Sequence, residues 1–293
     1  SYGIIEDIEV DGNKSNNASA GLGIKFTDAA SAEECGWEIK KVEIYNTTQV
    51  GLYVGTNRQA FYGNHIIVDA AGEHGVQIKG SDATLIKLMV GSSAWKNIVI
   101  EGSVTRLIGG DCWSAGEDGI IVVGTNATIS NMGIDRNNRN GIFFDTGSSH
   151  GIVLGNTFHS NSQGGDNTYS DVKVGVSGGQ FTIQGNIFGA LDSGITLKRK
   201  YAIEVGANTA FFGGNTHNAT ASSTGFTDAL TGGVGTVGGT GVANKISYWA
   251  NASTLSTATG LAWDDSNRRL GINSTAPGFT FETAGADSSA NGA

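Results

Sequence analysis

Charged and aromatic side chains recur at one position of a repeating pattern, and their chemistry suits a binding or catalytic site. Two residues before the turn residue of successive repeats stand Glu73, Trp95, Glu117, Arg139, Tyr169 and Asp192. Aromatic faces cover pyranose rings, and charged side chains bind hydroxyl or carboxylate groups. We therefore predict a sugar-binding ridge along these repeats. Its substrate-binding residues are expected to be Glu73, Trp95, Arg139 and Tyr169.

The acids on and beside this ridge favour a hydrolytic reaction. Glu73 and Glu117 stand two repeats apart, which is roughly 9–10 Å if neighbouring turns have the ordinary strand spacing. That is near the separation in an inverting glycosidase, where one acid protonates the leaving oxygen and the other activates water. We predict Glu117 as a catalytic residue, with Asp118 or Asp145 as its partner. Asp135 is a further alternative, and a merely solvated role for all these acids stays open.

Composition excludes several classes of function. The net charge of −9 argues against nucleic acid or an anionic membrane as the main partner, because both attract basic patches. No apolar run is long enough for a membrane span, so no membrane insertion is expected. The five histidines lack metal-ligand spacing, and Cys35 and Cys112 form no Cys-x-x-Cys motif. We expect no cofactor and no metal site. Ser1 is not an initiator Met, so we expect a fragment or processed product.

A short repeat, a turn residue followed by apolar-x-apolar, must position these side chains. The turn residues are Gly23, Gly51, Gly75, Asn97, Gly119, Gly141, Asp171 and Gly194, each followed by an apolar residue. A period near 22 with strand-like content is typical of a solenoid, in which each turn is buried against the next. The sequence therefore predicts an all-β fold, a right-handed parallel β-helix of about 22 residues per turn over residues 1–218.

Each turn is expected to contain three short strands. The middle turns place the first strand at Val76–Ile78, Ile98–Ile100, Ile120–Val122, Ile142–Phe144 and Val172–Val174. Longer apolar runs, such as Leu85–Met89 and Ile129–Ile134, supply the others. Asn156, Asn186 and Asn215 recur at one corner, where stacked Asn side chains can bond to their own turn and the next. We interpret them as an internal ladder.

One column of apolar residues is expected to point outward. Val99, Ile121 and Phe143 are the middle residues of three successive triplets. An outward apolar stripe on a protein surface usually marks an interface, and a covering loop of the same chain is the alternative.

The sequence after the solenoid changes in composition and then contains a specific motif. Residues 219–240 are rich in Gly, Ser and Thr and are expected to form a linker. Residues 241–293 include Trp263-Asp264, Arg269-Leu270-Gly271-Ile272 and Thr275-Ala276-Pro277 in that order. This segment resembles the shaft module of bacteriophage tail fibres and tailspikes, which in that family typically precedes a C-terminal intramolecular chaperone. The intervening Asp264–Arg268 segment is expected to be a hairpin turn.

The resemblance implies a β-rich trimeric shaft and an extracellular role in the virion, as part of a phage tail. A segment of about fifty residues with a few β pairs is too small for a monomeric core, whereas three chains around one axis could bury the rings of Trp249, Trp263, Phe279 and Phe281. We predict a homotrimeric tailspike or tail-fibre protein that binds a bacterial surface polysaccharide, with hydrolysis of that glycan open. The alternatives are a non-enzymatic receptor-binding or structural fibre and a secreted bacterial lyase or glycosidase of the pectate-lyase-like solenoid group.

Overall fold

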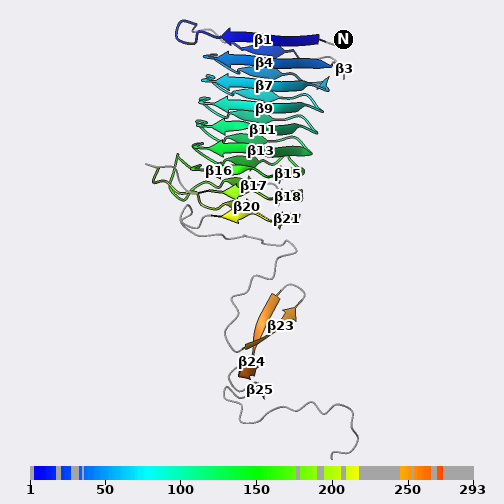
Figure 1. Cartoon of the computed structure of the whole chain (residues 1–293), viewed down its shortest axis with the longest axis vertical. Helices are drawn as coiled ribbons and strands as arrows, with labels where there is room; N and C mark the ends of the chain where they lie inside the picture. Colours follow the sequence, from blue (N-terminus) through cyan, green and yellow to red (C-terminus); the bar gives the residue numbers. More distant parts are fainter. Residues whose placement is uncertain are drawn as a thin grey trace, which may run out of the picture. The chain divides into compact units, whose positions relative to one another are not determined.

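Long and short β-strands alternate along most of the chain and stack into a parallel β-helix (Figure 1). The computed structural model describes residues 3–17, 21–27, 33–34, 36–175, 179–189, 195–205, 209–217, 245–251, 254–264 and 269–272. The chain divides into two units, Ser1–Gly233 and Val234–Ala293. The first unit contains the β-helix, and the predicted fold class is confirmed.

The long strands form one sheet, in which each strand pairs in parallel with its counterpart one turn earlier. They are β1 (Gly3–Asp11), β4 (Trp37–Tyr45), β7 (Tyr62–Asp69), β9 (Thr84–Gly91), β11 (Arg106–Trp113), β13 (Ala127–Asp135), β15 (His150–Leu154), β16 (Thr157–His159), β18 (Gln180–Gln184), β19 (Ile187–Phe188), β21 (Thr209–Gly213) and β22 (Thr216–His217). The short pair β3 (Glu33–Glu34) and β6 (Arg58–Gln59) lies in a separate small sheet.

The short strands form the second sheet. They are β2 (Ile24–Phe26), β5 (Leu52–Val54), β8 (Val76–Ile78), β10 (Ile98–Ile100), β12 (Ile120–Val122), β14 (Ile142–Phe144), β17 (Val172–Val174) and β20 (Ile203–Val205). The five predicted triplets are therefore confirmed. The predicted position of the eighth repeat, at Gly194 and Ile195, was wrong. Val172 pairs with Ile203, and residues 195–198 are not in a strand. Ile195 and Leu197 match the pattern but are only half-buried, whereas Ile203 and Val205 enter the core.

A bend divides each long strand into two halves. One residue per turn takes a left-handed conformation at this point, as at His65, Lys87, Gly109, Asn131 and Gly155. Up to β13 the two halves are continuous, and from β15 and β16 onward they are separate strands. The bend accounts for the prediction of three strands per turn, because its two sides are the second and third strands. A second left-handed column, which includes Ser92, Ser114 and Arg136, forms the corner directly after the long strands.

Alternate side chains of the long strands fill the core. In the second half, Ile44, Val68, Val90, Cys112, Ile134 and Phe158 stack in register and are all 0% exposed. The predicted Asn ladder is confirmed at the bend. The Asn156 amide donates to Asn186 Oδ1 at 3.1 Å, and the Asn186 amide donates to Asn215 Oδ1 at 3.0 Å. Residues that alternate with the core therefore form an outer face on which a site can be built.

The apolar stripe that the sequence predicts on the outside is largely covered, which corrects the expectation of an exposed interface. Val99, Ile121 and Phe143 do stack in register, but Val99 and Ile121 are only 6% and 8% exposed. Gln77 lies beside Val99 on the preceding turn, and Glu101 directly follows β10. The side chains of Gln77 and Glu101 are hydrogen-bonded to each other. Side chains of the same chain thus leave little apolar surface there for a partner.

The second unit contains a three-stranded antiparallel sheet. Its strands are β23 (Lys245–Asn251), β24 (Thr254–Asp264) and β25 (Arg269–Ile272). Asp264 pairs with Arg269, so the two strands form the hairpin that the sequence predicts. The predicted linker, residues 219–240, lies outside the described residues, and the trimeric shaft stays a prediction. In the described part of the chain no helix could span a membrane.

Candidate functional site

The predicted ridge exists as a stacked column over four turns. Backbone N–H groups of Trp95, Glu117 and Arg139 donate to the carbonyl oxygens of Glu73, Trp95 and Glu117 respectively. Beyond Arg139 the stacking passes to Ser162, whose N–H donates to the Arg139 carbonyl at 3.0 Å. Tyr169 follows a loop and bonds through its N–H to the Ser162 hydroxyl. Asp192 lies outside the described residues.

Glu117 is held by two cations on this ridge. Lys96 Nζ lies 2.5 Å from one carboxylate oxygen, and the Arg139 guanidinium lies 3.2 Å from the other. The hydrogen bond from Lys96 lowers the pKa of Glu117. An ionised carboxylate with both oxygens engaged is poorly placed to donate a proton to a glycosidic oxygen.

The two predicted partners of Glu117 lie elsewhere. Asp118 is only 4% exposed and accepts hydrogen bonds from the backbone N–H and the side-chain amide of Asn140. Burial raises the pKa of Asp118, but the carboxyl belongs to an internal polar ladder. Asp145 follows β14, whereas Glu117 precedes β12, so the short strands separate the two columns. The structure does not bring Glu117, Asp118 and Asp145 together.

A different column of functional side chains lies on the outer face of the second half of the long-strand sheet. Consecutive turns place Tyr45, Asp69, Gly91, Trp113, Asp135 and His159 in register. A Cβ added at Gly91 would lie 2.1 Å from the Trp113 ring, so the indole lies across the position that a side chain would fill. Aromatic and acidic groups thus alternate along one ridge.

Asp111 lies diagonally beside Asp135. Asp111 pairs with Gly133, and Asp135 follows Gly133 by two residues on β13. Strand geometry places the Cα atoms of the two acids about 8 Å apart. A Cβ at Gly133 would lie 2.3 Å from Asp111 Oδ1, which shows that the carboxyl extends over this glycine. The two acids are therefore diagonal neighbours on adjacent turns, and the Asp111 carboxyl reaches the strand that carries Asp135.

These acids line a hollow of about 530 Å³, here called the Asp111 hollow. Its other lining residues include Gly133, Arg136, Thr157 and His159. Although Asp111 is exposed as a residue, partial burial of its carboxyl raises its pKa, and the charge of Asp135 adds to the effect. Arg136 Nε lies 2.6 Å from Asp135 Oδ2, so the second carboxylate has a cationic partner. The hollow combines an acid whose pKa is raised with a second acid that is paired to a guanidinium.

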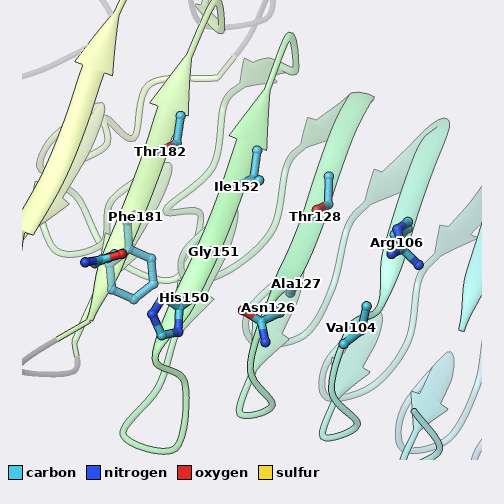
Figure 2. A pocket seen from close by; sticks show the side chains of 11 residues that line it. Val104, Arg106, Asn126, Ala127, Thr128, His150, Gly151, Ile152, Phe181 and Thr182 are labelled. Carbon is cyan, nitrogen blue, oxygen red and sulfur yellow. The ribbon is translucent and has the colours of Figure 1, made fainter. Parts of the chain in front are cut away.

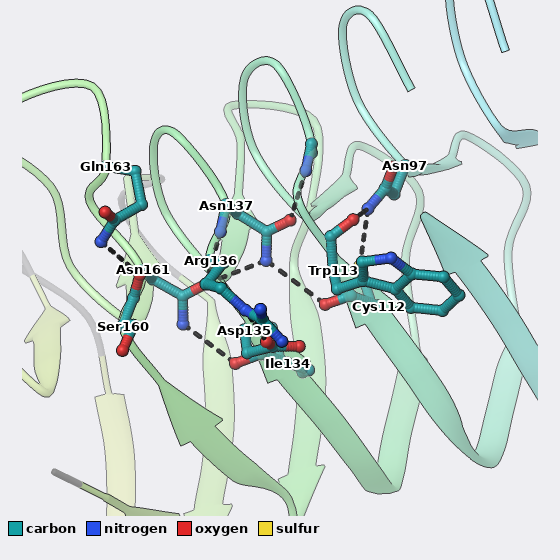
Figure 3. A network of polar contacts seen from close by, with 11 residues as sticks. Asn97, Cys112, Trp113, Ile134, Asp135, Arg136, Asn137, Ser160, Asn161 and Gln163 are labelled. Atoms are coloured by element: carbon teal, nitrogen blue, oxygen red, sulfur yellow. Dashed lines mark hydrogen bonds and ion pairs between the residues drawn. The ribbon is translucent and has the colours of Figure 1, made fainter. Parts of the chain in front are cut away.

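A buried amide network supports this corner (Figure 3). The Ala115 N–H donates to Asn137 Oδ1 at 2.9 Å, and the Asn137 amide donates to Asn161 Oδ1 at 2.9 Å. The Asn161 amide in turn donates to the Ile134 carbonyl, next to Asp135. The network satisfies the backbone of the tight turns, so it fixes the direction in which Asp135 and Arg136 leave the sheet.

A second hollow of about 530 Å³ lies on the other side of the bend and is here called the Arg106 hollow (Figure 2). Arg106, Thr128, Ile152 and Thr182 extend from successive strands of the first half, with His150 beside them. No carboxylate side chain is among the described residues that line it. The two hollows lie on the same turns but differ in charge.

Sequence reasoning named Asp135 as an alternative and missed Asp111 and Trp113. The signal that could have identified Asp111 is its spacing of 24 residues from Asp135, which is one turn of 22 residues plus two residues along a strand. That spacing marks diagonal neighbours on one face of a sheet. In the part of the chain that is described, no three His, Cys, Asp or Glu side chains are grouped to hold a metal ion.

Several solved structures share this fold. The chain resembles the enzymatically active domain of tailspike protein 2 of bacteriophage CBA120, with 16% identity, a TM-score of 0.58 and coverage of 71% of this chain and 35% of that chain. The A-module of the mannuronan C-5 epimerase AlgE4 from Azotobacter vinelandii gives 15% identity, a TM-score of 0.61 and coverage of 82% and 76%. Pectate lyase Pel9A gives 12% identity, a TM-score of 0.52 and coverage of 76% of this chain and 69% of that chain. The chain thus spans about a third of the length of the tailspike structure.

No curated protein matches the chain. The model of the family described as "Right handed beta helix region" matches residues 23–188, which cover β2 to β19 and all the lining residues of both hollows. With the parallel stacking of both sheets, this match shows that the chain belongs to the right-handed β-helix family.

Proposed function

We propose that this protein binds a bacterial surface polysaccharide on the outer face of its long-strand sheet and hydrolyses it in the Asp111 hollow. The observation that carries the proposal is the diagonal pair Asp111 and Asp135 in a hollow with Arg136 and His159. Trp113 and Tyr45 extend the same face as aromatic surfaces for sugar rings.

The chemistry divides between the two acids. Asp111, whose raised pKa favours the protonated form, donates a proton to the glycosidic oxygen as the bond to the sugar breaks. Asp135, paired with Arg136, either activates a water molecule or attacks the anomeric carbon. His159 stacks on Asp135 one turn later and orients a substrate hydroxyl. Gly133 has no side chain, so the Asp111 carboxyl can extend over it on the floor of the hollow.

The biological setting that we propose is a phage tailspike or tail fibre. The C-terminal motif around Trp263 and Arg269 resembles the shaft module of such proteins, and a tailspike domain is among the structures with this fold. A homotrimer in the virion follows from that resemblance. Light scattering tests the assembly: a solution mass of one chain, 30.1 kDa, would contradict the trimer.

A depolymerisation assay tests the reaction. The protein is incubated with capsules and lipopolysaccharides from a panel of bacteria, and the polymer length is followed by size-exclusion chromatography. We expect shortening by the wild type and by Glu101→Gln, a control at an acid directly after β10, but not by Asp135→Asn. Loss of activity in Glu117→Gln with full activity in Asp135→Asn would move the reaction to the ridge at Glu117. Binding without shortening by the wild type would leave a receptor-binding fibre and overturn the hydrolase.

A further inference from the structure

The Arg106 hollow differs from its surroundings because it contains a cation without an acid. The chain carries a net charge of −9, yet none of the described lining residues has a carboxylate side chain. Asp82, at the start of the preceding turn, is not among the residues that line it. Within the described part of the chain, the Arg106 guanidinium has no ion pair within 4.0 Å and no side-chain hydrogen bond.

The remaining lining groups are uncharged donors and apolar surfaces. Thr128, Thr182 and Gln180 offer hydroxyl and amide groups, and Ile152, which is 42% exposed, offers an aliphatic face. The His150 ring lies 2.9 Å through Nδ1 from the Ser149 hydroxyl, which leaves its other nitrogen directed away from that contact. A planar guanidinium recognises carboxylate or phosphate groups through two parallel N–H bonds. Charge complementarity therefore points to an anionic group on a sugar.

We propose that the Arg106 hollow is an anion-binding subsite, which holds an acidic sugar of the same glycan that is cleaved in the Asp111 hollow. This inference rests on the proposed function and adds the class of the substrate. The glycan has a mixed repeating unit, with an anionic sugar and a sugar that carries no acid. Asp135 disfavours a second negative charge at the point of cleavage, whereas the Arg106 guanidinium on the other side of the bend attracts one.

The positions of the two hollows set the path of the glycan. Arg106 and Asp111 lie on the same strand, five residues apart, on either side of the bend at Gly109. β13 contributes Thr128 to one hollow and Asp135 to the other. A glycan that reaches both hollows therefore runs parallel to the strands over several sugar units. Each hollow binds a different sugar of that glycan.

A binding experiment tests the subsite without the need for cleavage. The probe is an oligosaccharide of alternating glucuronate and N-acetylglucosamine, used in its native form and after reduction of its carboxyl groups. Binding is measured by isothermal titration calorimetry in an Asp111→Asn background, so that hydrolysis does not consume the ligand. We expect the native form to bind about tenfold more tightly, because a charge-assisted hydrogen bond is worth about that factor.

The expected preference depends on one side chain. Arg106→Gln in the same background should bind the native and reduced forms equally, whereas Lys14→Gln, which removes an equal charge in the turn after β1, should keep the tenfold difference. Equal binding of both forms by the starting protein, or a preference that survives in Arg106→Gln, would overturn the subsite. No measurable binding of either form would overturn it as well. Hydrolysis of a natural capsule is measured separately, so its failure would overturn the proposed reaction and not the preference.

Discussion

The two halves of the long-strand sheet share one backbone design but present opposite chemistry. Each half stacks in register and buries alternate residues. On the first side of the bend the outer face carries Arg106, Thr128 and Ile152, and on the second side it carries Asp111, Trp113 and Asp135. The fold therefore does not determine where a reaction takes place. The identity of a few outward residues on three turns does.

The difference also shows how a solenoid can produce a shifted pKa on an exposed face. A single acid beside uncharged neighbours stays close to its usual pKa, but Asp111 extends over Gly133, on the strand that carries Asp135. Partial burial and the second charge both disfavour ionisation of Asp111. The first half has no such pair among its described lining residues, so the comparison predicts reactivity on one side and binding on the other.

The largest expected effect comes from removing the proposed acid. Asp111→Asn should lower kcat by about 10²–10⁴, the usual contribution of a general acid. Arg106→Gln should change KM and leave kcat nearly constant, because Arg106 is proposed to hold a sugar away from the breaking bond. Steady-state kinetics on a capsule that the wild type shortens would measure both. A kcat that falls equally in the two variants would remove the division between the halves.

A smaller but still large effect should follow from a methyl group on the floor of the Asp111 hollow. In Gly133→Ala the new Cβ would stand 2.3 Å from the present position of Asp111 Oδ1, so the carboxyl must move. A misplacement of about 1 Å can cost about 100-fold in rate. Thr128→Val, on the same strand in the first half, is the matched control and should retain kcat. Full activity of Gly133→Ala would show that the position of Asp111 is not critical.

Sequence periodicity predicted the fold well, because the buried residues must recur once per turn. Val76, Ile98, Ile120 and Ile142 are 22 residues apart and stack as expected. The period failed at Ile195, where a loop of a different length precedes β20. A local apolar-x-apolar match does not reveal whether a segment enters the core, because that depends on the length of the intervening loop.

The candidate site was harder to predict for a physical reason. The sequence identified the columns, and the stacking of Glu73, Trp95, Glu117 and Arg139 is present. It did not show that Lys96 neutralises Glu117 or that Asp118 turns inward to Asn140. Residues one position apart on a strand face opposite sides, and diagonal neighbours become visible only when the register is known. The catalytic roles of Glu117, Asp118 and Asp145 remain predictions that the Glu117→Gln assay examines first.

A moderate effect is expected when the aromatic surface of the second half is removed. Trp113→Ala should raise KM by about 2–10-fold, because an aromatic contact of this type is worth about 0.5–1.5 kcal/mol. Since the Trp113 ring lies over Gly91, on the strand opposite to that of Asp135, kcat should change little. Initial rates over a range of polymer concentrations separate the two parameters. A fall in kcat without a change in KM would place the indole next to the breaking bond.

The smallest effect, a change in one pKa, tests the pairing on which the comparison depends. Partial burial is the main cause of the raised pKa of Asp111 and the charge of Asp135 is the second, so Asp135→Asn should lower the pKa while leaving it above the usual value. Carbon-detected NMR of the Asp111 carboxyl against pH measures this directly, and Glu101→Gln should leave the titration unchanged. Asp111 loses its proton as the pH rises through its pKa. In Asp135→Asn this loss should therefore occur at a lower pH than in the wild type. An identical titration in both proteins would mean that the two carboxyl groups do not interact electrostatically. That result would contradict the proposal that both act on the same glycosidic bond.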